Sequence, residues 1–85
     1  MSPWSPIPSL KKTMRVLIDA GYSNEASSTL IWRELKRQTG TIRDATLSKY
    51  VETMEEFNLI QPIKDKNGRR IMGVWRIMAE EEWEI

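Results

Sequence analysis

The clearest indication of the fold is the sequence of residues 41–60, Thr41-Ile-Arg-Asp-Ala-Thr-Leu-Ser-Lys-Tyr-Val-Glu-Thr-Met-Glu-Glu-Phe-Asn-Leu-Ile60. Four apolar residues in it recur at spacings of four, three and five: Leu47, Val51, Met54 and Leu59. Most of them therefore form one stripe along a helix, whereas Thr46, Lys49 and Thr53 fall on a different side. We expect a helix with one face packed in a core and another free to contact a partner.

The chain has 85 residues, no cysteine and no histidine, and this composition narrows what it can do. A domain of this length buries only about 60 to 65% of the surface that its unfolded chain exposes, so dimerisation would add stability. Disulfides, thiolate zinc sites and catalysis by cysteine or histidine are excluded. The glutamate groups Glu55-Glu56 and Glu80-Glu81-Glu82 are sequential rather than convergent, and the four glycines are isolated. We therefore predict no enzyme, no cofactor, no metal and no small-molecule ligand.

Charge is divided unevenly along the chain. All 13 Lys and Arg and eight of the 12 carboxylates lie in residues 1–78, which leaves that part a surplus of five positive charges. The last seven residues hold the other four carboxylates and no base. A basic body with an acidic tail suits a polyanionic partner, although the same surplus also serves solubility.

The sequence contains no segment that predicts membrane contact. No apolar run approaches the roughly 20 residues needed to span a bilayer, and residues 1–8 have neither a basic start nor an apolar signal segment. We expect a cytoplasmic protein, associated with the nucleoid or, if the source is viral, present in the host cytoplasm.

The first part of the chain predicts an arm followed by an amphipathic helix. Three prolines keep residues 1–8 extended, because proline lacks an amide donor and biases the residue before it away from helix. Ser9 is a suitable N-cap, and the apolar spacing after it predicts a helix that ends near Ala20, with Gly21 as its stop signal.

A second helix is predicted over residues 30–39. One of the three hydroxyl residues at positions 27–29 caps it, and Gly40 stops it. A few extended residues can precede this helix. The short glycine-containing link to the next helix is typical of a helix-turn-helix.

Residues 59–77 predict a β-hairpin. Asn67-Gly68 lies between runs of β-branched and aromatic residues, and both residues accept the positive φ of a type I′ turn. Pro62 cannot donate to a ladder, so we expect it on an edge strand or at a strand's start. Residues 78–85 follow as an acidic tail, in which like charges oppose a helix.

This order of elements resembles the winged helix-turn-helix fold of small bacterial, archaeal and viral transcription regulators. The resemblance covers about residues 9–77 and is sharpest at residues 42–60, where a Thr-Leu-Ser-Lys-Tyr run, a Glu-Glu pair and a Leu-Ile pair look like the recognition helix and its exit into the wing. It implies an α+β, mainly α, fold of three helices followed by a β-hairpin wing. Residues 1–8 and 78–85 lie outside that domain. Where such regulators often have Ser or Thr, this chain has Arg43-Asp44; Asp44 can cap the helix but repels phosphates.

The resemblance implies sequence-specific binding to double-stranded DNA as a transcriptional regulator. Helix 41–58 would enter the major groove, and hairpin 63–72 would contact the backbone or the minor groove. The candidate contacts are Arg43, Thr46, Lys49, Tyr50 and Thr53 on the helix and Lys64, Lys66, Arg69 and Arg70 on the hairpin. We expect them to form one continuous positive surface. The alternative interpretations are a solvated helix face and hairpin lysines that discourage edge aggregation.

The two terminal segments carry tryptophans that a core this small accommodates poorly. We predict a homodimer in which Trp4 and Trp83 form the contact, with packing onto their own domain as the alternative. The tail glutamates can be solvated, join a dimer contact, or mimic phosphate over the basic face. A second functional hypothesis is a winged-helix protein-interaction module in a replication or DNA-segregation assembly, because fold alone does not decide function.

Overall fold

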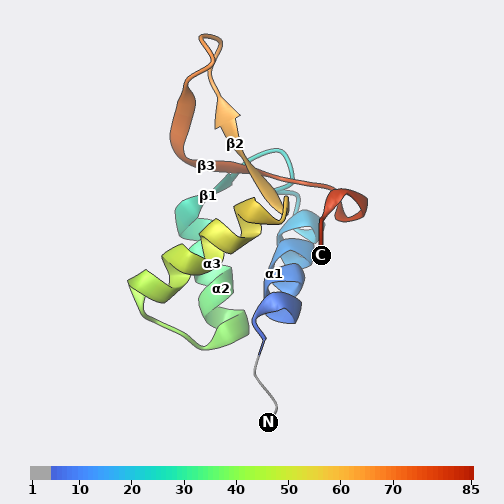
Figure 1. The fold of residues 1–85 in the computed structure, drawn as a ribbon, viewed down its shortest axis with the longest axis vertical. Coiled ribbons are helices and arrows are strands. Elements are labelled where there is room, and N and C mark those ends of the chain that lie inside the picture. Colours follow the sequence, from blue (N-terminus) through green and yellow to red (C-terminus); the bar gives the residue numbers. More distant parts are fainter. Residues whose placement is uncertain (1–4) are drawn as a thin grey trace.

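The structure is a computed structural model that describes residues 5–85. Three helices are followed by a small antiparallel sheet, the α+β layout that the sequence predicts for a winged helix (Figure 1). The elements in chain order are α1 Ile7–Asp19, β1 Ala26–Ser27, α2 Ser28–Thr39, α3 Asp44–Glu56, β2 Ile60–Lys64, β3 Arg70–Ile77 and the 3₁₀ turn η1 Glu80–Glu82. The three strands lie in the order β1-β3-β2, and the β2–β3 hairpin projects away from the helices.

Helix α1 begins earlier than the sequence predicted. It starts at Ile7 with Pro6 at the N-cap, and the Leu10 amide donates to the Pro6 carbonyl at 2.9 Å. The prediction that residues 7 and 8 belong to an extended arm was therefore wrong. The physical reason is that first-turn amides have no partner inside a helix, so Pro8 loses no hydrogen bond there.

Helix α2 ends at Thr39, as predicted, and begins at Ser28, two residues before the predicted start. The Leu30 amide donates to the Ser27 hydroxyl at 3.1 Å, which confirms a hydroxyl cap. Gly40 closes the helix with a φ of +75°, a conformation that favours glycine. The extended residues before the helix form β1, which pairs with Trp75 and Val74 of β3.

Helix α3 is shorter than the predicted range 41–58. Arg43 has extended backbone and occupies the N-cap without a side-chain bond, so Asp44 lies in the first turn and does not cap the helix. Its carboxylate still stabilises the helix, because it lies near the positive end of the helix dipole. Leu47 and Met54 are fully buried as the stripe predicted. Leu59 is buried as well, but beyond the helix.

The turn of the hairpin differs from the predicted type I′. Asn58 is the one residue other than glycine with positive φ in residues 5–85, so Asn67 does not have the required conformation. The Gly68 amide instead donates to the Asp65 carbonyl at 2.9 Å, and Gly68 has a φ of +81°. One Asp65 carboxylate oxygen accepts the amides of Asn67 and Arg69, each at 2.9 Å. The Asp65 side chain therefore holds this loop in place, and Gly68 supplies the left-handed conformation that closes the turn.

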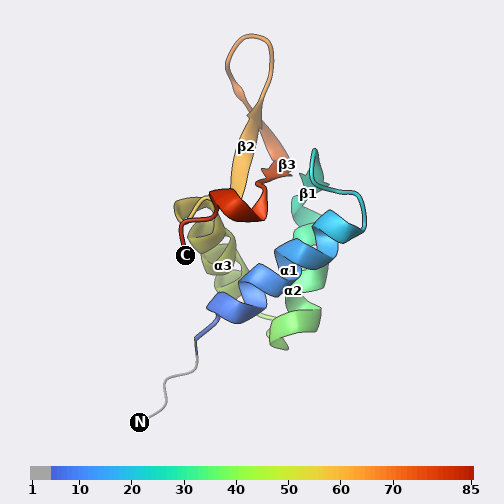
Figure 2. The same cartoon turned by 90° about the vertical axis from the view of Figure 1, so that its right-hand side faces the viewer.

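The acidic tail lies against its own domain, beside α1 and the C-terminal end of α3 (Figure 2). The Glu84 amide donates to the Phe57 carbonyl at 2.9 Å, and Arg15 of α1 pairs with Glu80 at 2.8 Å. Trp83 packs partly buried on the core and donates from its indole nitrogen to the Met78 carbonyl. In residues 5–85 the tail is therefore not placed over the hairpin.

The core is one apolar cluster to which every helix and strand contributes. Pro62 lies on the edge strand β2, as predicted, and pairs with Trp75. Among the described residues, no helix is long and apolar enough to cross a membrane. The core members are Leu10, Met14, Leu17, Ala26, Ile31, Leu35, Leu47, Met54, Leu59, Ile60, Trp75 and Ile77.

Candidate nucleic-acid interface

The five candidate residues on α3 differ in how available they are. Arg43 and Lys49 are exposed at the N-terminal half of the helix. Thr46 is half-buried, and Tyr50 packs against the core. Thr53 is also half-buried, and its hydroxyl donates to the Lys49 carbonyl at 3.0 Å. The two cations are therefore the most available of the five for a partner.

Carboxylates interrupt the positive surface that the sequence analysis expected. Glu52 and Glu55 of α3 line the groove that separates this helix from the hairpin, and Glu56 adjoins them. The expectation of one continuous positive surface was therefore wrong. The prediction placed Thr46, Lys49 and Thr53 on the outward side of the helix and did not include these carboxylates. Their spacing from Ser48, at four and seven residues, is a helical signal that points them to one flank.

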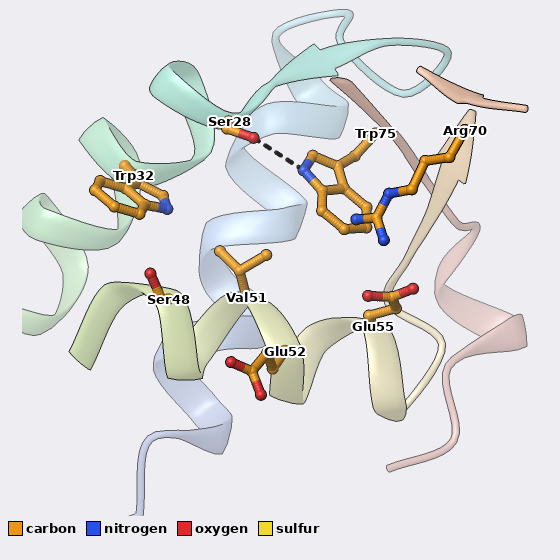
Figure 3. Close-up of a pocket in the computed structure, with 8 residues that line it drawn as sticks. All are labelled: Ser28, Trp32, Ser48, Val51, Glu52, Glu55, Arg70 and Trp75. Atoms are coloured by element: carbon orange, nitrogen blue, oxygen red, sulfur yellow. Dashed lines mark hydrogen bonds between the residues drawn. The ribbon is translucent and has the colours of Figure 1, made fainter. Parts of the chain in front are cut away.

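The groove has aromatic walls and a volume of about 300 Å³ (Figure 3). Trp32 of α2, Val51 of α3 and Trp75 of β3 contribute its apolar part, and two hydroxyl residues, Ser28 and Ser48, complete the lining. The Trp75 indole nitrogen donates to the Ser28 hydroxyl at 3.1 Å. This bond joins the base of the hairpin to the first turn of α2.

Arg70 differs from the other candidate cations of the hairpin. Its guanidinium carbon lies 4.5 Å from the centre of the Trp75 ring, a cation–π distance. Arg70 also lines the groove opposite Glu52 and Glu55 (Figure 3). In this position Arg70 is directed along the groove, so it is less available to a phosphate than its neighbours are.

Lys64, Lys66 and Arg69 are the cations at the outer part of the hairpin, and all three are exposed. Within residues 5–85 the ion pairs are Arg15–Glu80 and Arg37–Glu34, so these three have no carboxylate partner there. Asp65 lies among them, but its Oδ1 atom accepts two backbone amides. Within the described part of the chain, the projecting end of the hairpin thus presents three positive charges without a carboxylate partner (Figure 1).

The ion pair between the tail and α1 shifts the titration of its members. The hydrogen bond from Arg15 lowers the pKa of the Glu80 carboxyl, and the same bond raises the pKa of Arg15. Trp83 lies beside this pair, with the Arg15 guanidinium 5.6 Å from its ring centre.

Trp4 lies outside the described residues, so the dimer contact through Trp4 and Trp83 stays a prediction.

The described residues 5–85 contain no group of histidine, cysteine or acidic side chains that could hold a metal ion. Comparison of the chain with protein-family models, with curated proteins and with solved structures found no match. The fold assignment therefore depends on the arrangement of the elements. Three helices and a three-stranded antiparallel sheet are compatible with a winged-helix-like α+β fold.

Proposed function

We propose that the protein binds double-stranded DNA as a small transcriptional regulator. The observation that supports this most is the set of three exposed cations, Lys64 at the end of β2 and Lys66 and Arg69 in the β2–β3 loop, which form no ion pair within residues 5–85. Phosphate contacts by Lys and Arg supply most of the non-specific affinity for a duplex, and a projecting hairpin can reach the backbone beside an inserted helix.

The N-terminal half of α3 is the part of the helix that suits a major groove. Arg43 and Lys49 are exposed there, and a guanidinium can donate two hydrogen bonds to a guanine edge. Glu52 and Glu55 lie toward the C-terminal end and repel phosphates. The duplex therefore contacts the first turns of α3 and the hairpin loop, and its backbone avoids the groove between them.

A gel shift with a random-sequence duplex of about 20 base pairs tests the proposal, with binding measured near 50 and 200 mM salt. Five contacts, from the three hairpin cations, Arg43 and Lys49, predict a slope of about −4.5 in log K against log salt. Affinity then falls by roughly 500-fold over that fourfold rise in salt. Absence of a shifted complex at the lower salt would refute the proposal.

A protein-interaction module in a replication or DNA-segregation assembly is the second candidate function. The groove favours it, because Trp32 and Trp75 lie beside Glu52 and Glu55, which form no ion pair with any described residue, and such a lining suits a lysine or arginine side chain of a partner. The double variant Glu52→Gln/Glu55→Gln separates the two functions. It strengthens duplex binding if DNA is the ligand, because two charges that repel phosphates are removed, and it weakens binding of a basic partner.

A further inference from the structure

Strand β3 carries a bulge in its pairing with β2, opposite the segment between Pro62 and Lys64. Pro62 pairs with Trp75 and Lys64 pairs with Arg70, so β3 advances five residues where β2 advances two. Gly73 lies in the extra segment with a φ of +82°, which favours glycine. The strand bends outward there, on the side of the molecule where the N-terminal end of α3 also lies (Figure 1).

The bulge exposes two neighbouring apolar side chains. Met72 is 79% exposed and Ile71 is 41% exposed. Neither belongs to the core or to the partly buried residues packed against it. Methionine is unbranched and adaptable, so its side chain can enter a narrow gap between flat rings.

The surroundings of this apolar pair are positively charged. Arg69 lies two residues before Ile71, and Lys64 lies across the ladder from Arg70, whose own guanidinium is directed along the groove over Trp75. An apolar bulge with cations beside it suits an anionic partner that offers apolar surface behind its charges. In the minor groove of DNA, base-pair edges lie behind the phosphates, and proteins that bind there insert apolar wedges between base steps, which exposes the apolar base faces.

We propose that Met72, supported by Ile71, inserts between two base pairs from the minor groove and kinks the bound duplex. This inference depends on the proposed DNA binding and adds a mode of recognition to it. Pyrimidine–purine steps such as TA unstack most easily, so the hairpin selects sites that contain one, without hydrogen bonds to bases. The Lys64 and Arg69 side chains hold the two phosphate backbones beside the kinked step.

The full chain and a duplex of about 20 base pairs with 2-aminopurine at a central TA step test the wedge. Fluorophores on the two ends of the duplex report bending. We expect binding to raise the 2-aminopurine fluorescence and to bring the ends closer, with a bend of about 20 to 90°. The variant Met72→Ala loses both signals and binds about tenfold more weakly, because the buried apolar side chain is gone.

Two variants act as controls. Met72→Leu keeps an apolar side chain of similar size and retains both signals. Ile85→Ala removes another exposed apolar side chain, 37% exposed, from the acidic tail away from the proposed interface, and leaves the unstacking signal unchanged. Because both sites are exposed, neither change disturbs the core.

The outcomes distinguish the insertion of Met72 from the DNA binding on which it depends. Wild-type protein that binds the duplex with unchanged fluorescence and end-to-end distance overturns the wedge and leaves DNA binding in place. The same holds if Met72→Ala unstacks the step as well as the wild type does. No binding of any duplex overturns both proposals. If the protein binds vesicles of anionic lipid through Met72, and its duplex signals do not depend on Met72, the exposed apolar pair contacts a membrane surface. This result also overturns the wedge.

Discussion

Ser28→Ala tests how the hairpin is joined to the helices. The Ser28 hydroxyl accepts the hydrogen bond of the Trp75 indole at 3.1 Å, and Trp75 is only 6% exposed. The substitution leaves this donor without its partner. A neutral hydrogen bond contributes about 1 kcal/mol net, and a donor left unsatisfied costs about 1 to 3 kcal/mol. Because the groove beside it is open to water, we expect a loss of about 1 kcal/mol, at the lower end of that range.

Thermal unfolding followed by circular dichroism measures this loss. For a domain of 60 to 100 residues, a change of about 1 kcal/mol lowers Tm by about 4 to 8 °C. Ser48→Ala is the matched control, because Ser48 lines the same groove but is exposed on α3. Alanine is the better helix former, so this control is expected to melt at the wild-type temperature or slightly above it.

A double-mutant cycle with Trp75→Phe isolates the bond from the rest of the packing. Phenylalanine keeps an aromatic ring but has no donor, so Ser28→Ala should have little further effect in that background. The expected coupling is about 1 kcal/mol. A coupling near zero, or a Tm of Ser28→Ala within about 1 °C of the wild type, would show that the Ser28–Trp75 hydrogen bond does not hold the hairpin to α2.

Three other predictions concern the exposed cations, the ion pair between α1 and the tail, and the terminal segments. Arg69→Ala should flatten the slope of log K against log salt for duplex binding by about 0.9, whereas Lys12→Ala on α1 should leave it unchanged; equal slopes would exclude a phosphate contact at Arg69. The lowered pKa of Glu80 means that its ion pair with Arg15 stabilises the fold above the ordinary glutamate pKa and that this contribution is lost as pH falls through the lowered value. Glu80→Gln should therefore lower the urea midpoint at neutral pH, by a small amount because the pair is exposed, and match the wild type in acid; a difference that persists in acid would count against the pair. If the termini form a homodimer, sedimentation at high micromolar concentration should give a dimer that Trp83→Ala weakens, and a wild-type monomer under those conditions would remove the dimer hypothesis.

Local sequence signals predicted the elements that depend on nearby residues. The cap at Ser27 and the stop at Gly40 need only a hydroxyl and a residue that tolerates positive φ. The buried stripe of Leu47 and Met54 follows from helical spacing. Pro62 on the edge strand follows from its missing amide.

The features that the sequence did not predict depend on competition or on contacts between elements. Asp65 displaces the turn expected from Asn67-Gly68, because its carboxylate accepts two loop amides. The direction of Arg70 depends on Trp75, which is near it only because β3 bulges. The flank of α3 that faces the hairpin is likewise set by tertiary packing. Composition alone therefore did not reveal that Glu55 borders the candidate interface.

Titration of ¹⁵N-labelled protein with a random duplex of about 16 base pairs, followed by amide chemical shifts, locates the surface that contacts DNA. DNA binding through the hairpin loop and the first turns of α3 predicts that the largest shifts cluster at residues 64–70 and 43–49 and diminish as salt is raised. Shifts confined to α1 and the tail, or no shifts at low salt, would contradict it.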